Sequence, residues 1–254
     1  MNTQRMSSPQ LAYYDMGTGV LAFSTTRQGG SSTGNYAAFN INNYCGDAPE
    51  HIARNRQALA ALIGVPEQHI IMPHQTHGKV VRRVDAPPTE VLEGVDAVMT
   101  DVKGLCIGVS TADCIPILLY DAEHHAVCAV HAGWRGTVQR IVQEAVAQMQ
   151  EAYHSQPRRL KAVIGPGISL ESFEVGDEVY QQFVDAGFDM APIARRFAKW
   201  HLDLPQCNRL QLEAVGVQNV WMSDICTYQQ YEQYFSARRL GINSGRIYTA
   251  IVLK

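Results

Sequence analysis

Three short apolar segments near the middle of the chain limit most strongly what it can fold into. They span residues 105–109, 115–120 and 126–130, and polar turns separate them. Apolar runs of this length between turns are typical of buried strands. The second and third flank the polar stretch 121–125, so we expect these two strands to pair as an antiparallel hairpin. A β-sheet should therefore lie at the centre of the fold.

Helices and further strands are predicted on both sides of this sheet. The clearest helix follows Gly136, where apolar residues recur at the spacing of one helical face. These residues are Val138, Ile141, Val142, Ala145, Val146 and Met149. Helices are also expected at residues 47–63, 177–186 and 206–215, and strands at residues 162–164 and 247–253. Asp47 could cap the helix 47–63. The irregular alternation predicts an α+β fold with mixed β-sheets.

The length and charge of the chain narrow its organisation and its partners. A chain of 254 residues can bury a full core, and no repeat or linker divides it, so we expect residues 1–254 to form one domain. The net charge of -3 gives no electrostatic argument for binding nucleic acid or an anionic membrane. Residues 1–10 lack the apolar core of a signal peptide, and no segment reaches the ~20 apolar residues of a membrane span. We therefore predict a cytoplasmic protein.

The chain has six cysteines, and no two of them form a CxxC pair. Disulfides are rare in the reducing cytosol, so we expect six free thiols. The usual patterns of structural zinc sites and thioredoxin-like redox sites are also absent. Each cysteine is then either a core residue or part of an active site.

Polar residues gather at the predicted ends of strands, in residues 75–78, 111–114 and 131–136. These segments contain His77, Cys114 and His131. Two imidazoles and one thiolate suit zinc, which takes nitrogen and sulfur ligands in a tetrahedron and keeps one position for water in catalytic sites. Cys114 and His131 would lie on adjacent strands of the hairpin. We therefore predict that the three residues form one metal site.

Other interpretations of these residues stay open. A single cysteine often acts as a small buried hydrophobe. Cys114 could also be the nucleophile of a metal-free Cys-His hydrolase, with His131 or His77 as its base. A third interpretation is a non-catalytic regulatory binding protein. His74 lies three residues before His77, but Pro73 predicts an extended segment there, so we expect His74 in a surface or supporting position.

Several short motifs occur along the chain, namely TTRQGG, QTHG, TADC followed by IP, HAGWRGT, IGPGIS, FEVGDEV, CTY and FSARR. Together they resemble the YfiH-type family, whose members have been called laccase-domain or multicopper polyphenol oxidoreductases and purine nucleoside phosphorylases. They run from about residue 20 to the C-terminus, and the order and spacing of TADC and HAGWRG are specific. One departure is Ala237, which stands where an aromatic residue is common in the family.

The resemblance implies a fold and a function. The fold would be an α+β domain related to cysteine-hydrolase-like toxin domains, with the metal ligands on His77, Cys114 and His131. The function would be zinc-dependent phosphorolysis of adenosine, inosine, guanosine and methylthioadenosine, with some adenosine deamination, so purine nucleosides and phosphate would be the partners. The older laccase label requires a copper cluster built from many imidazoles, whereas this chain has nine histidines and no His-x-His pair. Its one thiolate and two imidazoles can bind a single zinc, or a single copper in its place.

Phosphate as a co-substrate requires cationic side chains, because guanidinium groups bind phosphate through paired hydrogen bonds. The candidates are Arg27, Arg135, Arg238 and Arg246. The sequence favours Arg135, which lies four residues after His131 at the start of a predicted helix, where an anion would be stabilised. The candidates for a general base are Asp113, Glu174 and Asp224. Asp113 would face away from Cys114, because neighbouring strand residues point to opposite sides.

Overall fold

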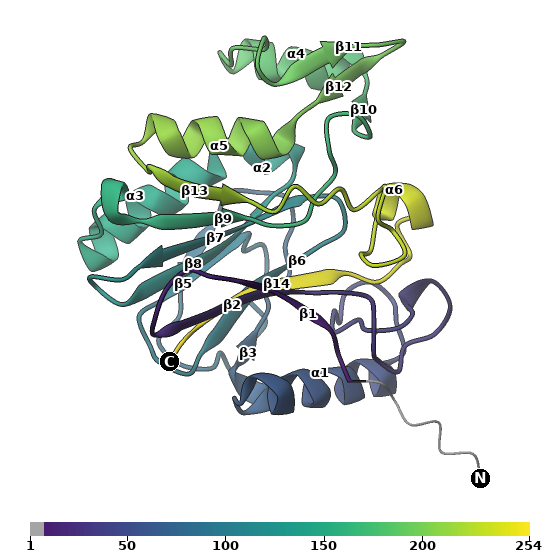
Figure 1. Cartoon of the computed structure of the whole chain (residues 1–254), viewed down its shortest axis with the longest axis vertical. Helices are drawn as coiled ribbons and strands as arrows, with labels where there is room; N and C mark the ends of the chain where they lie inside the picture. The colour runs from purple at the N-terminus through teal and green to yellow at the C-terminus, as the bar shows by residue number, and fades with distance from the viewer. Residues whose placement is uncertain (1–7) are drawn as a thin grey trace.

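Two large β-sheets form the centre of the fold in the computed structural model, which describes residues 8–254 (Figure 1). The five-stranded sheet has the order β1 (Leu11–Tyr14), β2 (Val20–Thr25), β14 (Ile247–Leu253), β6 (Cys106–Thr111) and β3 (Ile70–Ile71). Its strands pair antiparallel, except that β3 runs parallel to β6. The C-terminal strand β14 therefore lies inside the sheet, beside β6.

The six-stranded sheet contains the predicted hairpin. Its order is β13 (Asn219–Met222), β9 (Lys161–Ile164), β7 (Ile115–Asp121), β8 (Ala126–Ala132), β5 (Ala97–Thr100) and β4 (Val81–Arg83). β7 and β8 pair antiparallel with Leu118 opposite Ala129, which confirms the hairpin. β13 runs parallel to β9, and β4 runs parallel to β5, so this sheet is mixed, as predicted.

The two sheets pack face to face, and helices cover their outer faces, which gives four layers (Figure 1). Along β7, Leu118 contributes to the core between the sheets, whereas Leu119 contributes to the core under α3 (Ile141–Tyr153) and α5 (Leu204–Ala214). On the opposite side, α1 (Pro49–Ile63) packs against the outer face of the five-stranded sheet. Because both faces of β7 are buried, its sequence is an almost continuous apolar run.

Smaller elements complete the chain. A third sheet packs beside α4 (Asp177–Asp185) at the top of Figure 1 and was not predicted, since its strands are very short. Its order is β10 (Glu174–Val175), β12 (Trp200–Leu202) and β11 (Ala194–Arg196). The remaining helices are α2 (Trp134–Val138) and α6 (Ala237–Leu240), with 3-10 helices at Gly34–Tyr36, Glu67–His69 and Pro157–Arg159.

The long helix predicted after Gly136 is broken in two. α2 ends at Val138 and α3 begins at Ile141. Between them, Arg140 has a φ angle of 61°, a left-handed conformation that cannot continue a right-handed helix. The apolar face predicted for this segment is nevertheless buried, chiefly on α3.

The prediction that Asp47 caps α1 was wrong. Pro49 is the first residue of the helix, so the N-cap position falls on Ala48. The carboxylate of Asp47 accepts hydrogen bonds from the Ser32 hydroxyl at 2.6 Å and from the Asn40 amide at 2.9 Å. Asp47 therefore stabilises the loop that precedes α1, through Ser32 and Asn40, and does not cap the end of the helix.

Within residues 8–254, no helix is both long and apolar enough to cross a membrane. All six cysteines lie in this part of the chain, and none is paired in a disulfide. The prediction that no signal peptide is present rests on residues 1–10, of which residues 1–7 lie outside the described residues.

Candidate metal centre and active site

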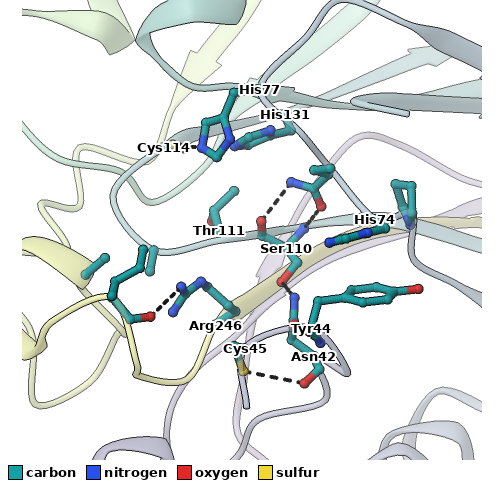
Figure 2. Close-up of a pocket in the computed structure, with 15 residues that line it drawn as sticks. Asn42, Tyr44, Cys45, His74, His77, Ser110, Thr111, Cys114, His131 and Arg246 are labelled. Carbon is teal, nitrogen blue, oxygen red and sulfur yellow. Dashed lines mark hydrogen bonds between the residues drawn. The ribbon is translucent and has the colours of Figure 1, made fainter. Parts of the chain in front are cut away.

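The ends of three strands bring the predicted site residues together at one edge of the two-sheet core. β6 ends at Thr111, Cys114 directly precedes β7, and His131 is the penultimate residue of β8. His131 lies opposite Pro116 in the β7–β8 hairpin, so Cys114 is held beside it by register. His77 comes from the segment between β3 and β4. Figure 2 shows the three side chains pointing toward one another.

The geometry of His77, Cys114 and His131 fits a metal ion. One ligand atom of each residue lies within 4.8 Å of the others, and the Cys114 Sγ to His77 Nε2 distance is 3.8 Å. A tetrahedral zinc ion with bonds of 2.0–2.3 Å would hold such atoms roughly 3.5 Å apart. The residues that were predicted from three separate segments thus converge with almost the spacing that zinc requires.

One buried carboxylate that was not predicted from the sequence binds the His131 ring and the backbone of His77. Asp96 is fully buried, and its Oδ1 accepts hydrogen bonds from His131 Nδ1 at 2.7 Å and from the His77 backbone N–H at 2.9 Å. Its Oδ2 accepts the backbone N–H of Gly78 at 2.8 Å. Because Nδ1 of His131 donates to Asp96, Nε2 is left to face the thiol as a ligand atom. The one indication of Asp96 in the sequence is that an acidic residue stands directly before the apolar residues of strand β5.

The charges in this site stabilise one another. Burial alone would raise the pKa of the Cys114 thiol, but the adjacent His131 and His77 imidazoles outweigh it and lower this pKa to about 6. Burial opposes the charged form of His131, yet the Cys114 thiolate and Asp96 raise the pKa of His131 to about 9. Burial likewise opposes ionisation of Asp96, but its hydrogen bond to His131 lowers the net pKa of the carboxyl. Cys114 is therefore poised as the thiolate that metal binding requires.

The backbone around these residues is shaped for close approach. His77 and Asp113 have φ angles of 64° and 86°, which non-glycine residues rarely adopt and which cluster at functional sites. A Cβ atom on Gly133 would lie 2.9 Å from His77 Cδ2 and 3.0 Å from Cys114 Sγ. Glycine at position 133 therefore lets the β8–α2 turn pass directly beneath the two ligands.

The three candidates for a general base lie away from this centre. Asp113 turns its carboxylate from Cys114 and accepts hydrogen bonds from Thr227 Oγ1 at 2.7 Å and from the Arg238 backbone N–H at 2.6 Å. Glu174 forms an exposed ion pair with Lys199 at 2.8 Å, and Asp224 lines a separate cavity. None of the three lines the cavity that contains the histidines and Cys114.

A cavity of about 290 Å³ opens from the metal-ligand residues toward solvent (Figure 2). This volume lies near the lower end of the ~300–1,000 Å³ range of small-molecule sites. Its polar lining, beyond the metal-ligand residues, comprises Asn42, Tyr44, Cys45, His74, Gln75, Ser110, Thr111 and Arg246. Ala237, the departure from the family pattern, and Ile242 complete one side of the wall. The cavity thus joins a potential metal centre to a set of hydrogen-bonding groups.

Of the four candidate arginines, only Arg246 lines this cavity. Arg135 is exposed on the short helix α2, with its guanidinium 4.2 Å from the centre of the Trp134 ring. Arg27 donates to the backbone carbonyl oxygens of Ala37 and Tyr231. The Arg238 guanidinium donates to the Glu174 carbonyl oxygen at 3.1 Å. The sequence could not rank Arg246 first, because only the pairing of β14 with β6 brings it to the site.

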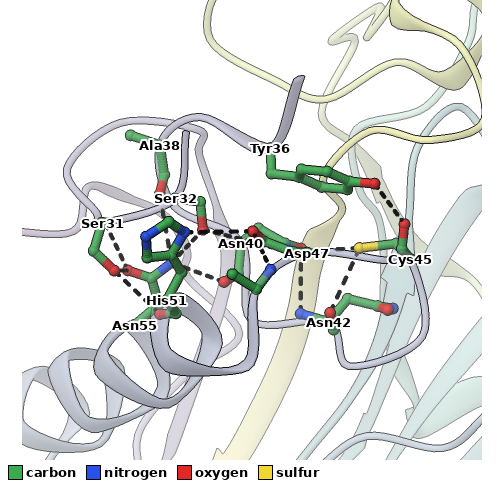
Figure 3. A network of polar contacts seen from close by, with 11 residues as sticks. Ser31, Ser32, Tyr36, Ala38, Asn40, Asn42, Cys45, Asp47, His51 and Asn55 are labelled. Carbon is green, nitrogen blue, oxygen red and sulfur yellow. Dashed lines mark hydrogen bonds and ion pairs between the residues drawn. The ribbon is translucent and has the colours of Figure 1, made fainter. Parts of the chain in front are cut away.

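A buried polar network around Asn40 (Figure 3) supports the part of the cavity wall that contains Asn42 and Arg246. Asn40 is fully buried, and its Oδ1 accepts the backbone N–H groups of Asn42 at 3.2 Å and Arg246 at 3.1 Å. Its Nδ2 donates to Asp47 at 2.9 Å. Asn42 in turn donates to the Ser110 hydroxyl at 2.6 Å. This network therefore fixes Asn42 and the backbone of Arg246 relative to Ser110 of strand β6.

His74 lines the same cavity but does not join the three ligand residues. Its Nδ1 lies 2.7 Å from Glu93 Oε2, and its ring stacks on Tyr44 with 4.2 Å between centroids. Both contacts agree with the supporting position expected from Pro73.

Comparison with known proteins identifies relatives over most of the chain. The family model described as "Multi-copper polyphenol oxidoreductase laccase" matches residues 21–254. A Bacteroides thetaiotaomicron protein named "Purine nucleoside phosphorylase" is 44% identical over 244 residues, which cover 91% of this chain and 90% of that protein. A protein from an unknown prokaryotic organism, named "Adenosine deaminase RL5", is 42% identical and covers 93% of this chain and 95% of its own length. Among solved structures, YfiH from Bacillus licheniformis superposes with a TM-score of 0.92 at 27% identity, over 97% of each chain.

Proposed function

The chain belongs to the family described as multi-copper polyphenol oxidoreductase laccase, and on that premise we propose that it is a zinc-dependent purine nucleoside phosphorylase with adenosine deaminase activity. Its substrates would be adenosine, inosine, guanosine and methylthioadenosine, each with phosphate. Relatives named for both activities support an enzyme of nucleoside metabolism. The observation that carries the proposal is one cavity lined by His77, Cys114 and His131 together with Arg246.

The residues favour a single metal ion rather than a copper cluster. Among residues 8–254, His77, Cys114 and His131 form the one group of three or more metal-binding side chains. A laccase needs several copper ions and many imidazoles, so the chemistry in the family description does not fit the donors of this chain. A bound zinc ion would act as a Lewis acid toward water or substrate. The fully buried Asp96 would hold the His131 imidazole in place for it and would fix the backbone at His77.

Phosphorolysis places specific demands on the cavity. An oxygen of hydrogen phosphate forms a bond to C1′ of the ribose, the C1′–N9 bond breaks, and the purine leaves with the bonding electrons and takes up the proton of the hydrogen phosphate. We assign phosphate binding to Arg246, because among residues 8–254 it is the one arginine or lysine that lines the cavity. Its Nη1 and Nη2 groups donate to the carbonyl oxygens of Ser244 and Ile242, which keeps the guanidinium in a fixed orientation for an anion.

Product analysis of matched variants tests this function. With adenosine and phosphate, the wild type should release adenine and ribose 1-phosphate, and with adenosine alone it should release inosine. Cys114→Ala should abolish both reactions. Arg246→Ala should raise the Michaelis constant for phosphate and leave deamination nearly unchanged, whereas the exposed Arg135→Ala serves as the matched control and should change neither. An absence of any purine product under all conditions would refute the proposal.

A metal-free Cys-His hydrolase is the second candidate function, and one observation favours it. Asp96, His131 and Cys114 are connected in the order acid, imidazole and thiol that nucleophilic enzymes use. Such an enzyme needs only one imidazole beside the thiol, whereas here two converge on it. Elemental analysis separates the two functions, because only the nucleoside phosphorylase should contain about one zinc per chain.

The domain and location predictions remain part of the same proposal. We propose that residues 1–254 act as one domain in the cytoplasm and that the fold is related to cysteine-hydrolase-like domains. Limited proteolysis and cell fractionation would test the first two points.

A further inference from the structure

Thr111 carries a buried hydroxyl group that has no hydrogen-bond partner in the described part of the chain. The residue ends strand β6 and is only 1% exposed. Its Oγ1 has no hydrogen-bond partner among the described residues. The neighbouring Ser110 hydroxyl, in contrast, accepts from Asn42 at 2.6 Å. Leaving a buried hydroxyl unpaired costs about 1–3 kcal/mol, so such a group calls for a partner such as water, an ion or a ligand.

The position of Thr111 shows where that ligand would lie. Thr111 lines the same cavity as the metal-ligand residues and Arg246. It pairs with Ile247 across strands β6 and β14, so Arg246 is the residue directly before its strand partner. In Figure 2, Thr111 lies between the histidines and Arg246. A ligand held by Arg246 would therefore share this cavity with the Thr111 side chain.

The chemistry of these two groups selects an anionic oxygen. Arg246 uses Nη1 and one Nη2 hydrogen on backbone carbonyl oxygens, and its Nε–H and second Nη2–H have no partner within residues 8–254. A threonine hydroxyl can donate one hydrogen bond, which is strongest toward a charged acceptor. We propose that Thr111 Oγ1 donates a hydrogen bond to an oxygen of the inorganic phosphate that Arg246 binds. This assignment rests on the proposed function, and it adds a specific phosphate-binding residue to it.

The decisive variant is Thr111→Val, which keeps the shape of the side chain and removes the hydroxyl. In the ligand-free protein, replacing an unpaired buried hydroxyl with a methyl group should leave the free energy of unfolding unchanged or raise it. The Michaelis constant for phosphate should rise about 10- to 100-fold, as expected for one lost hydrogen bond to a charged group. The Michaelis constant for inosine and the rate of adenosine deamination should stay unchanged. Thr111→Ser should recover most of the affinity for phosphate.

Thr249→Val is the matched control. Thr249 is fully buried, but its hydroxyl is paired with Ser24 Oγ at 2.6 Å. This variant should lower the free energy of unfolding and leave the Michaelis constant for phosphate unchanged, the opposite of the pattern expected for Thr111→Val. A purely structural role for Thr111 would make the two variants behave alike and would overturn the proposal.

Two further outcomes are informative. If Thr111→Val raises the Michaelis constant for nucleoside in both reactions, the hydroxyl contacts ribose, and the phosphate assignment is wrong. If the wild type turns over no nucleoside, the proposed function fails, but stabilisation by inorganic phosphate in thermal unfolding still tests Thr111. Wild type and Thr249→Val should then gain stability with phosphate, and Thr111→Val should gain much less; equal gains in all three would refute the assignment.

Discussion

Replacing Asp96 with asparagine keeps the shape of the side chain but removes the charge that holds two histidines in place. The carboxylate accepts hydrogen bonds from His131 Nδ1 and from the backbone N–H groups of His77, Gly78 and Thr76. The asparagine side chain has only one oxygen, which can accept hydrogen bonds from two of these four donors. Its NH₂ group must then face the other two donors and cannot accept from them. At about 1–3 kcal/mol for each of two donors left unpaired, the free energy of unfolding should fall by roughly 2–6 kcal/mol.

The same change should weaken metal binding. If the new NH₂ group faces His131, the imidazole must accept through Nδ1 and carry its proton on Nε2, where the metal would bind. Loss of such a supporting carboxylate typically costs about 10- to 100-fold in metal affinity. Denaturant unfolding and competition with a chelator would measure both effects, with Asp101→Asn as the control, because Asp101 is partly exposed and only contacts Arg83 at 3.4 Å. Zinc affinity equal to that of the wild type would refute the role assigned to Asp96.

Three further changes test neighbouring parts of the site. In metal-free protein, the pKa of Cys114 lies at about 6, below its usual value of 9.0. The stability that its thiolate contributes should therefore be present above pH 9 and lost as the pH falls through about 6. Alkylation of Cys114 should follow the same titration, and an apparent pKa near 9 would contradict the ion pair with the imidazoles. Gly133→Ala should reduce zinc affinity while the fold persists, because the added Cβ would displace His77 and Cys114; unchanged affinity would mean that the turn can move aside. Asn40→Asp should destabilise the protein by placing a second carboxylate beside Asp47, and it should raise the Michaelis constant for phosphate. The exposed Asn43→Asp should do neither. Equal effects of the two changes would rule out the hydrogen-bond network around Asn40 as the cause.

Local sequence patterns predicted the central part of the fold. The apolar runs of β7 and β8 have both faces buried, so they stand out in the sequence as strands, and the short polar turn between them fixes their pairing. The convergence of His77, Cys114 and His131 in one cluster was also predictable, because their segments combine polar residues with predicted strand ends. The third sheet was missed because its strands are only two or three residues long, too short for an alternating pattern.

Contacts between distant segments could not be predicted in the same way. Asp96 reaches His131 across 35 positions of sequence, and nothing in its own segment indicates a partner. Arg246 reaches the cavity because β14 pairs with β6, a long-range pairing that leaves no local pattern. The sequence instead favoured Arg135, because it lies close to His131 along the chain. The chain turns into α2 between these two residues, and the Arg135 side chain packs on Trp134 outside the cavity.

The central claim is that one metal ion bound by His77, Cys114 and His131 is required for nucleoside chemistry. The most direct test measures zinc content and the release of ribose 1-phosphate and inosine from adenosine on one sample, before chelation, after chelation and after zinc is added back. We expect about one zinc per chain at first, loss of both products with the metal, and recovery of both when zinc returns. Full turnover by protein shown to contain no metal would contradict it.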